Sequence, residues 1–279
     1  MTFHTAADYT PQQTELIRSA TLTAATILGD YMDDLAVVGG LVPSLLIPQT
    51  ELPAGAEPHV GTMDLDLGLD LAILDDQRYE GIAERLRDSD FEPDTSEKGF
   101  DVRQRWIHKR YPMAKIEFLI PPVSDQAKAG RLQSLEQGLA AFIIAGLEVA
   151  FSNPIHVRLE GTTLFGATAA RTIPVCNPGA FIILKALAFK NRGKRKDAYD
   201  LHYMIRNYGS GLEDVAEFLK PLLGTAPGQQ AVAILREDFM HEKALGPMGV
   251  TLFATGAEDA DIQADVVGFV AELLRVTGV

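Results

Sequence analysis

The sequence predicts an α+β protein in which a mixed sheet with flanking helices is followed by a mainly helical C-terminal region. The first observation is the strict alternation from Met63 to Leu71, where every second residue is apolar, as in a strand with one buried face. The second is a helix start signal at Asn177-Pro178, after which helical patterns continue to the C-terminus. We expect a sheet core with an N-terminal helix over 1–122, a β-rich connecting region over 123–177 and a helical domain over 178–279.

The residues before position 62 are expected to hold two helices and one strand. Thr10 and Pro11 suit the start of a helix whose apolar residues recur at helical spacing. A short apolar strand at 35–38 should end at Gly39-Gly40, and a brief helix at 41–47 should follow. Proline and glycine then predict a loop at 48–61.

The remaining elements follow from shorter patterns of apolar residues. Strands are expected at 63–71, 102–108, 115–120, 139–151, 155–159 and 172–175. Helices are expected at 75–88, 178–191 and 194–208, and the rest of the chain should be mostly helical.

Composition and charge restrict the class of protein. Hydrophobic residues make up 47% and charged residues 23% of the 279, which is typical of a globular chain rather than a disordered one. The net charge of −13 disfavours non-specific coating of nucleic acid. Residues 51–100 hold 4 basic and 14 acidic side chains, whereas residues 101–200 hold 15 basic and 8 acidic ones. Such blocks could supply a metal site and a phosphate site, or they could be chance clustering of surface charge.

The expected compartment is the cytoplasm. Cys176 is the only cysteine, so an internal disulfide is impossible and a reducing environment is expected. The first ten residues lack a basic start followed by an apolar run, and the most apolar stretch is too short to span a bilayer. No membrane partner is therefore expected.

Asp64 and Asp66 are the strongest candidates for metal ligands. Two residues apart on a strand, their carboxylates should project from the same face and repel one another unless a cation lies between them. Mg²⁺ accepts one or two carboxylates together with water and phosphate oxygens. The alternative is a solvated strand face. A calcium loop is disfavoured, because Gly68 falls at position five rather than six and Asp75 stands where a bidentate glutamate is needed.

Two further features of the front half could contribute to such a site. Glu117 lies at the centre of an apolar strand, where an acid is costly to bury unless it is paired or bound to metal. It could instead be an edge-strand acid facing water beside Lys115. Gly39-Gly40 lets the backbone approach a phosphate closely, although a simple turn would have the same sequence.

A basic run in the back half could bind phosphate. Six cations fall within twelve residues, at Lys185, Lys190, Arg192, Lys194, Arg195 and Lys196. Lys185 and Arg192 are seven residues apart and can share a helical face, and Asp197 and Asp200 follow closely. The alternative is a solvated helix end, since cations near a C-terminus suit the helix dipole.

Together these motifs resemble a known family. Gly39-Gly40, Thr62-Met63-Asp64-Leu65-Asp66 and Ile116-Glu117-Phe118-Leu119-Ile120-Pro121 are similar to the nucleotidyltransferase fold of the DNA-polymerase-beta-like superfamily. The spacing of Lys185, Ala188, Arg192, Lys196-Asp197 and Asp200-Leu201 resembles the third motif of the AbiEii-type nucleotidyltransferase toxins. The resemblance covers about residues 35–205, and the joint match is more specific than any single motif.

The resemblance implies an enzyme that moves a nucleoside monophosphate from a nucleoside triphosphate to a hydroxyl acceptor on tRNA or protein. It also implies a toxin neutralised by an antitoxin protein. Asp64, Asp66 and Glu117 would hold Mg²⁺ or Mn²⁺, and Glu117 could instead accept the acceptor's proton. The implied catalytic residues are Asp64, Asp66, Glu117, Lys185 and Asp200. The implied nucleotide-binding residues are Gly39, Gly40, Thr62, Lys185, Arg192, Lys196 and Asp197. The alternative is an inactive module of the same fold that binds nucleotide or a protein partner.

The chain departs from the family pattern at three places. The loop between Gly40 and Asp64 is long and carries Pro58-His59-Val60-Gly61, where the family often has a shorter segment with an arginine. Glu117 stands where an aspartate is usual, and Lys196 replaces an arginine.

Overall fold

A computed structural model describes residues 4–52, 56–70, 76–122, 129–136 and 138–279. Contacts divide the chain into two compact units. The sheet unit comprises Pro11–Val42 and Gly61–Cys176, and the helical unit comprises Met1–Thr10, Pro43–Val60 and Asn177–Val279. Residues 43–60 thus group with the C-terminal helices, although they precede the first acidic motif in sequence. The three-part division that the sequence suggests stays a prediction.

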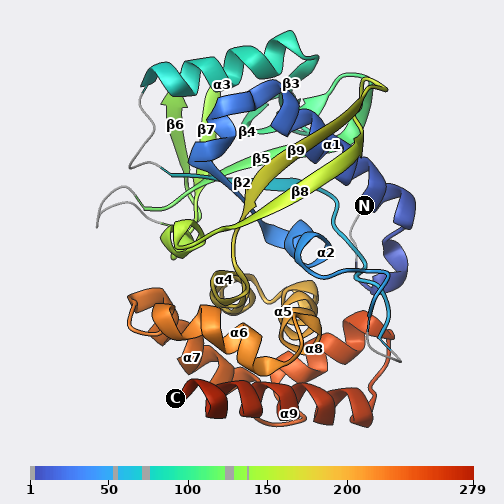
Figure 1. Ribbon diagram of the computed structural model, residues 1–279, viewed down its shortest axis with the longest axis vertical. Coiled ribbons are helices and arrows are strands. Elements are labelled where there is room, and N and C mark those ends of the chain that lie inside the picture. Colours follow the sequence, from blue (N-terminus) through green and yellow to red (C-terminus); the bar gives the residue numbers. More distant parts are fainter. Residues whose placement is uncertain (1–3, 53–55, 71–75, 123–128, 137) are drawn as a thin grey trace. The chain divides into compact units, whose positions relative to one another are not determined.

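The sheet unit is built on a mixed sheet, which confirms the predicted fold class (Figure 1). Among the described residues its strands are β1 Leu35–Val38, β2 Leu65–Leu69, β3 Phe91–Thr95, β4 Asp101–His108, β5 Tyr111–Ile120, β6 Leu132–Glu136, β7 Leu139–Ile143, β8 Ile155–Thr162 and β9 Thr168–Val175.

Both strand orientations occur at the centre of this sheet. The order is β3-β4-β5-β2-β1-β9-β8, and β6 and β7 form a hairpin of which β7 also pairs with β5. Strand β2 is antiparallel to β1 and parallel to β5, while β1 is parallel to β9. Strand β1 is apolar, as expected for a strand covered on both faces, and every one of its residues is buried.

Among the described residues, helices α1 (Pro11–Leu28) and α3 (Asp76–Asp88) accompany this sheet. Helix α1 contacts β5, β8, β9 and helix α3, which itself contacts β3 and β6. Ile17, Ala20, Ala24 and Leu28, four of the apolar residues that recur at helical spacing along α1, are fully buried. Short 3-10 segments lie at Gly29–Asp34, Gly39–Leu41 and Leu147–Phe151, and α2 (Val42–Leu46) follows the second of them.

The helical unit consists mainly of the predicted C-terminal helices. They are α4 Pro178–Arg192, α5 Arg195–Asn207, α6 Leu212–Leu219, α7 Ala226–Asp238, α8 Leu245–Ala254 and α9 Ala260–Thr277. The start of α4 is as expected, because the Asn177 side chain accepts a hydrogen bond from the Ala180 amide and Pro178 occupies the first turn. Gly193 ends the helix with φ +63°. None of the described helices is long and apolar enough to cross a membrane.

The structure corrects several expected elements. The strand expected at 139–151 is wrong in its second half, because Gly146 adopts φ +79° and a 3-10 turn follows instead. The strand expected from Met63 begins only at Leu65, and Leu71 and Asp75 lie outside the described residues. Strands β3 and β6 carry polar residues at many positions and were not expected.

Candidate active site

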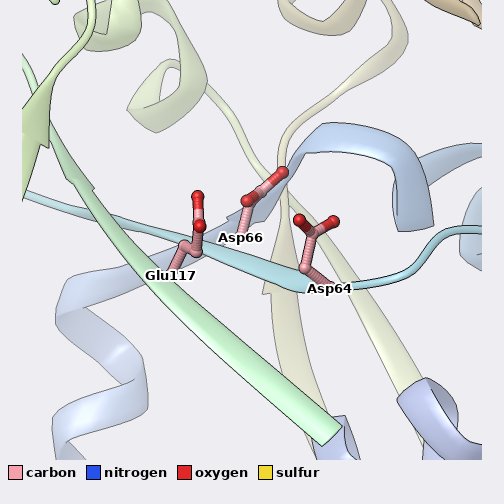
Figure 2. A group of neighbouring side chains, drawn as sticks. All are labelled: Asp64, Asp66 and Glu117. Carbon is pink, nitrogen blue, oxygen red and sulfur yellow. The ribbon is translucent and has the colours of Figure 1, made fainter. Parts of the chain in front are cut away.

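Three carboxylates meet on one face of the sheet. Asp64 lies immediately before β2, Asp66 lies within it, and Glu117 lies on β5. Each offers a ligand atom, and these atoms all lie within 4.8 Å of one another. Figure 2 shows the three side chains pointing to the same side. All three are half-buried, so they remain open to solvent or a ligand.

Strand register brings these acids together. Asp66 pairs with Glu117 across the parallel β2–β5 ladder and with Val38 across the antiparallel β1–β2 ladder. Because side chains alternate along a strand, Leu65 and Leu67 point to the opposite face, where both are fully buried. The apolar positions therefore fix which way the carboxylates face.

Polar neighbours hold two of the carboxylates. The Thr62 hydroxyl, itself buried, donates to Asp64 Oδ1 over 3.1 Å. Arg105 on β4 is the cross-strand partner of Glu117 and donates from Nε to Glu117 Oε1 over 2.5 Å. Its Nη1 reaches Asp94 at 3.4 Å. Arg105 was not among the sequence candidates, since only the register of β4 against β5 places it beside Glu117.

Gly39 lies against the Asp66 carboxylate. Its φ is +73°, and a Cβ added there would overlap the carboxylate of Asp66. The backbone of Gly39 therefore closely approaches a carboxylate in this structure, and the approach to a phosphate stays a prediction. Gly40 follows in the same 3-10 turn and is buried.

Gly39→Ala is expected to weaken divalent metal binding by displacing the Asp66 side chain. Gly99→Ala is the matched control, because Gly99 has φ +79° but nothing within 4 Å of an added Cβ. Both changes carry the strain of a left-handed residue, about 1–2 kcal/mol, and Gly39→Ala alone adds the overlap with Asp66. Only Gly39→Ala should alter Mn²⁺ affinity measured by calorimetry. Equal metal affinity in the two variants would contradict the role given to this contact.

The donor set fits a hard divalent cation. Three carboxylates this close repel one another unless a cation lies among them. Mg²⁺ and Mn²⁺ prefer oxygen ligands and keep water or phosphate oxygens as further ligands. Asp64, Asp66 and Glu117 could each supply one oxygen, and their partial exposure leaves room for others.

A second cluster forms in the helical unit around two buried aspartates. Lys185 Nζ on α4 donates to Asp197 at 3.1 Å and to Asp200 at 2.8 Å. Arg192 binds both oxygens of Asp197 at 2.7 Å. Lys196 spans both oxygens of Asp200 at 2.7 and 2.9 Å. We call Lys185, Arg192, Lys196, Asp197 and Asp200 the cation cluster.

Burial differs sharply among its members. The Lys185 side chain is 7% exposed and both aspartates are almost fully buried, whereas the Arg192 side chain is 48% exposed. Burial opposes charge on Asp200, but the ammonium groups of Lys185 and Lys196 hold its pKa well below the usual value. The carboxylates likewise raise the pKa of Lys185 against the effect of burial. For Lys196 burial dominates and lowers the pKa.

The rest of the basic run does not join this cluster. Lys190 pairs instead with Glu237 and Asp238, while Lys194 and Arg195 are exposed. The sequence candidates therefore fall into two sets. Gly39, Gly40, Thr62 and the three acids lie in the sheet unit, and the cation cluster lies in the helical unit.

His59 joins the cation cluster and was missed as a candidate. Its Nε2 lies 2.9 Å from Asp200 Oδ1, and its side chain is fully buried. The two residues are 141 positions apart, so no spacing in the sequence connects them. The one feature of the sequence that could have indicated His59 as a site residue is a histidine in a loop that departs from the family pattern.

A mixed sheet that presents three neighbouring carboxylates beside a Gly-Gly turn is the arrangement expected of the nucleotidyltransferase class. The family model described as nucleotidyl transferase AbiEii toxin, type IV TA system, matches residues 57–275, which is most of the chain. The chain therefore belongs to the AbiEii nucleotidyl transferase toxin family. A comparison with curated proteins finds no match.

Proposed function

We propose that this protein transfers a nucleoside monophosphate from a nucleoside triphosphate to a hydroxyl group on tRNA or protein, with Mg²⁺ or Mn²⁺. The observation that carries the proposal is the convergence of Asp64, Asp66 and Glu117 on one sheet face in a chain of this family. The acceptor oxygen forms a bond to the α-phosphorus, pyrophosphate leaves, and the acceptor's proton passes to solvent or a nearby base. The bound metal ion would neutralise phosphate charge and orient the attack.

The residues of the sheet unit are proposed to bind the metal and the triphosphate. Asp64 and Asp66 would hold the metal, with Thr62 fixing the orientation of Asp64. Arg105 occupies one oxygen of Glu117, which leaves the other oxygen free to be the third ligand. Gly39 and Gly40 supply a backbone turn next to these acids for the triphosphate.

The cation cluster is proposed to bind phosphate. It gathers three cations, Lys185, Arg192 and Lys196, around two carboxylates. Arg192, with its half-exposed side chain, is the most accessible of the three. Asp197 and Asp200 have their oxygens occupied by cations, and they are proposed to act by holding those cations in place.

The role as a toxin follows from the family. We propose that a co-expressed antitoxin protein counteracts the activity, and that this happens in the cytoplasm. Whether the acceptor is tRNA or a protein would determine which cellular process the toxin inhibits.

The direct test incubates the protein with each of four α-labelled nucleoside triphosphates, Mg²⁺ and a cell extract. We expect one label to enter RNA or protein with release of pyrophosphate, and chelation of the metal to stop it. Digestion of the product with ribonuclease or protease then names the acceptor. Binding of a triphosphate without transfer, under every combination, would instead support a nucleotide-binding module of the same fold.

A further inference from the structure

The environment of His59 suits a residue that positions others. Its ring is stacked on Tyr199 with centroids 5.6 Å apart and meets Tyr203 edge-on at 4.9 Å. The loop around it is held as well: the His59 amide donates to Gln49 Oε1 over 2.7 Å, and the Tyr203 hydroxyl donates to the Glu57 carbonyl over 3.1 Å. The imidazole therefore has one defined place against helix α5.

Both ring nitrogens of His59 have partners that fix its tautomer. Asp200 is a carboxylate and can only accept, so Nε2 carries the proton in that 2.9 Å contact. Nδ1 is then an acceptor, and the Ser44 hydroxyl lies 3.1 Å away to donate to it. Ser44 belongs to α2, the helix that follows the Gly39-Gly40 turn.

The charge of the cluster explains why a neutral donor suits this position. Desolvation lowers the pKa of His59 to about 4, so the ring is neutral near pH 7. A neutral N–H holds Asp200 without adding a third positive charge beside Lys185 and Lys196.

We propose that His59 is a positioning residue of the phosphate-binding cluster: its Nε2–H fixes the rotation of the Asp200 carboxylate, which in turn fixes the places of the Lys185 and Lys196 ammonium groups that bind phosphate. The inference rests on the proposed function, because it assigns a purpose to the cations of that site. It extends the site to a residue of the 48–61 loop.

Two substitutions separate this role from simple packing. In His59→Gln the side-chain amide reaches the place of Nε2 and can still donate to Asp200. In His59→Asn the amide reaches only the place of Nδ1, so the contact with Ser44 is kept and the contact with Asp200 is lost. His202→Asn is the matched control. His202 lies on α5, is buried like His59, and its Nε2 lies 3.1 Å from the Asp265 carboxylate.

The first readout is affinity for inorganic tripolyphosphate and for each magnesium nucleoside triphosphate, measured by calorimetry. His59→Asn should bind about tenfold more weakly, the loss typical of one hydrogen bond to a charged group. His59→Gln and His202→Asn should bind as wild type does. Wild-type affinity in folded His59→Asn, or an equal loss in His202→Asn, would overturn the inference.

The second readout needs no ligand and so separates this inference from the proposed function. The ammonium groups of Lys185 and Lys196 should give slowly exchanging NMR signals in wild type and His59→Gln, and the Lys196 signal should shift or vanish in His59→Asn. Unchanged signals in His59→Asn would overturn the positioning role even if the protein bound no nucleotide. Should His59→Asn fail to fold, loss of both signals in folded His59→Gln would overturn it equally.

Discussion

Asp66→Asn is expected to abolish nucleotidyl transfer and to remove measurable Mn²⁺ binding, while the protein stays folded. Asp66 lies at the centre of the acidic cluster, between the Gly39 backbone and Glu117. A metal ion contributes several kcal/mol of transition-state stabilisation, and each 1.36 kcal/mol is tenfold in rate. We therefore expect at least about a thousandfold loss. Asp64→Asn should behave alike, and either change should leave melting unchanged or raise it, because one repelling charge is gone.

Asp70→Asn is the control for this prediction. Asp70 belongs to the same alternating run as Asp64 and Asp66 but lies outside the acidic cluster. Its substitution should leave metal affinity and transfer close to wild type. Full transfer by Asp66→Asn, or an equal loss in Asp70→Asn, would remove the metal assignment.

The same measurements of Mn²⁺ affinity and nucleotidyl transfer resolve the role of Glu117. If Glu117 is a metal ligand, Glu117→Asp should keep part of the Mn²⁺ affinity and Glu117→Gln should lose it. Asp is shorter by one methylene, so Glu117→Asp would also loosen the contact with Arg105. If both variants kept the metal dependence of wild type, Glu117 would be an ordinary acid paired with Arg105.

Lys185→Ala is expected to destabilise the helical unit by about 3–5 kcal/mol, the usual effect of breaking a buried ion pair from one side. The side chain is almost fully buried, and its loss leaves Asp197 and Asp200 with fewer compensating charges. Chemical unfolding followed by circular dichroism would measure this loss. A stability equal to wild type would show that the two carboxylates find other partners.

Arg192→Ala is the companion variant because it separates stability from binding. Its side chain is half-exposed, so the fold should change little. If the cluster binds triphosphate, Arg192→Ala should weaken that binding about ten- to a hundredfold. The double Lys194/Arg195 alanine variant should bind triphosphate as wild type does, because both side chains face solvent. Equal triphosphate affinity in wild type, Arg192→Ala and the double variant would show that the cation cluster is a structural ion-pair network.

Local signals were enough to predict the central strands and the helix starts. The alternation around Asp66 predicted a strand with acids on one face, and Asn177-Pro178 predicted the start of α4. Strand length was less predictable. Gly146 divides an apolar run into a strand and a 3-10 turn, because its left-handed conformation, with φ +79°, turns the chain out of the extended direction.

By itself the sequence determined the mixed α+β fold class, the two motifs rich in charge and the family they resemble. These depend on residues near one another in the chain, where alternation, caps and spacing act directly. Only the tertiary structure decided which distant groups meet. Strand register placed Arg105 beside Glu117, and packing against α5 placed His59 beside Asp200. These contacts join positions 12 and 141 residues apart on different elements, so they follow from how the elements pack rather than from any local pattern.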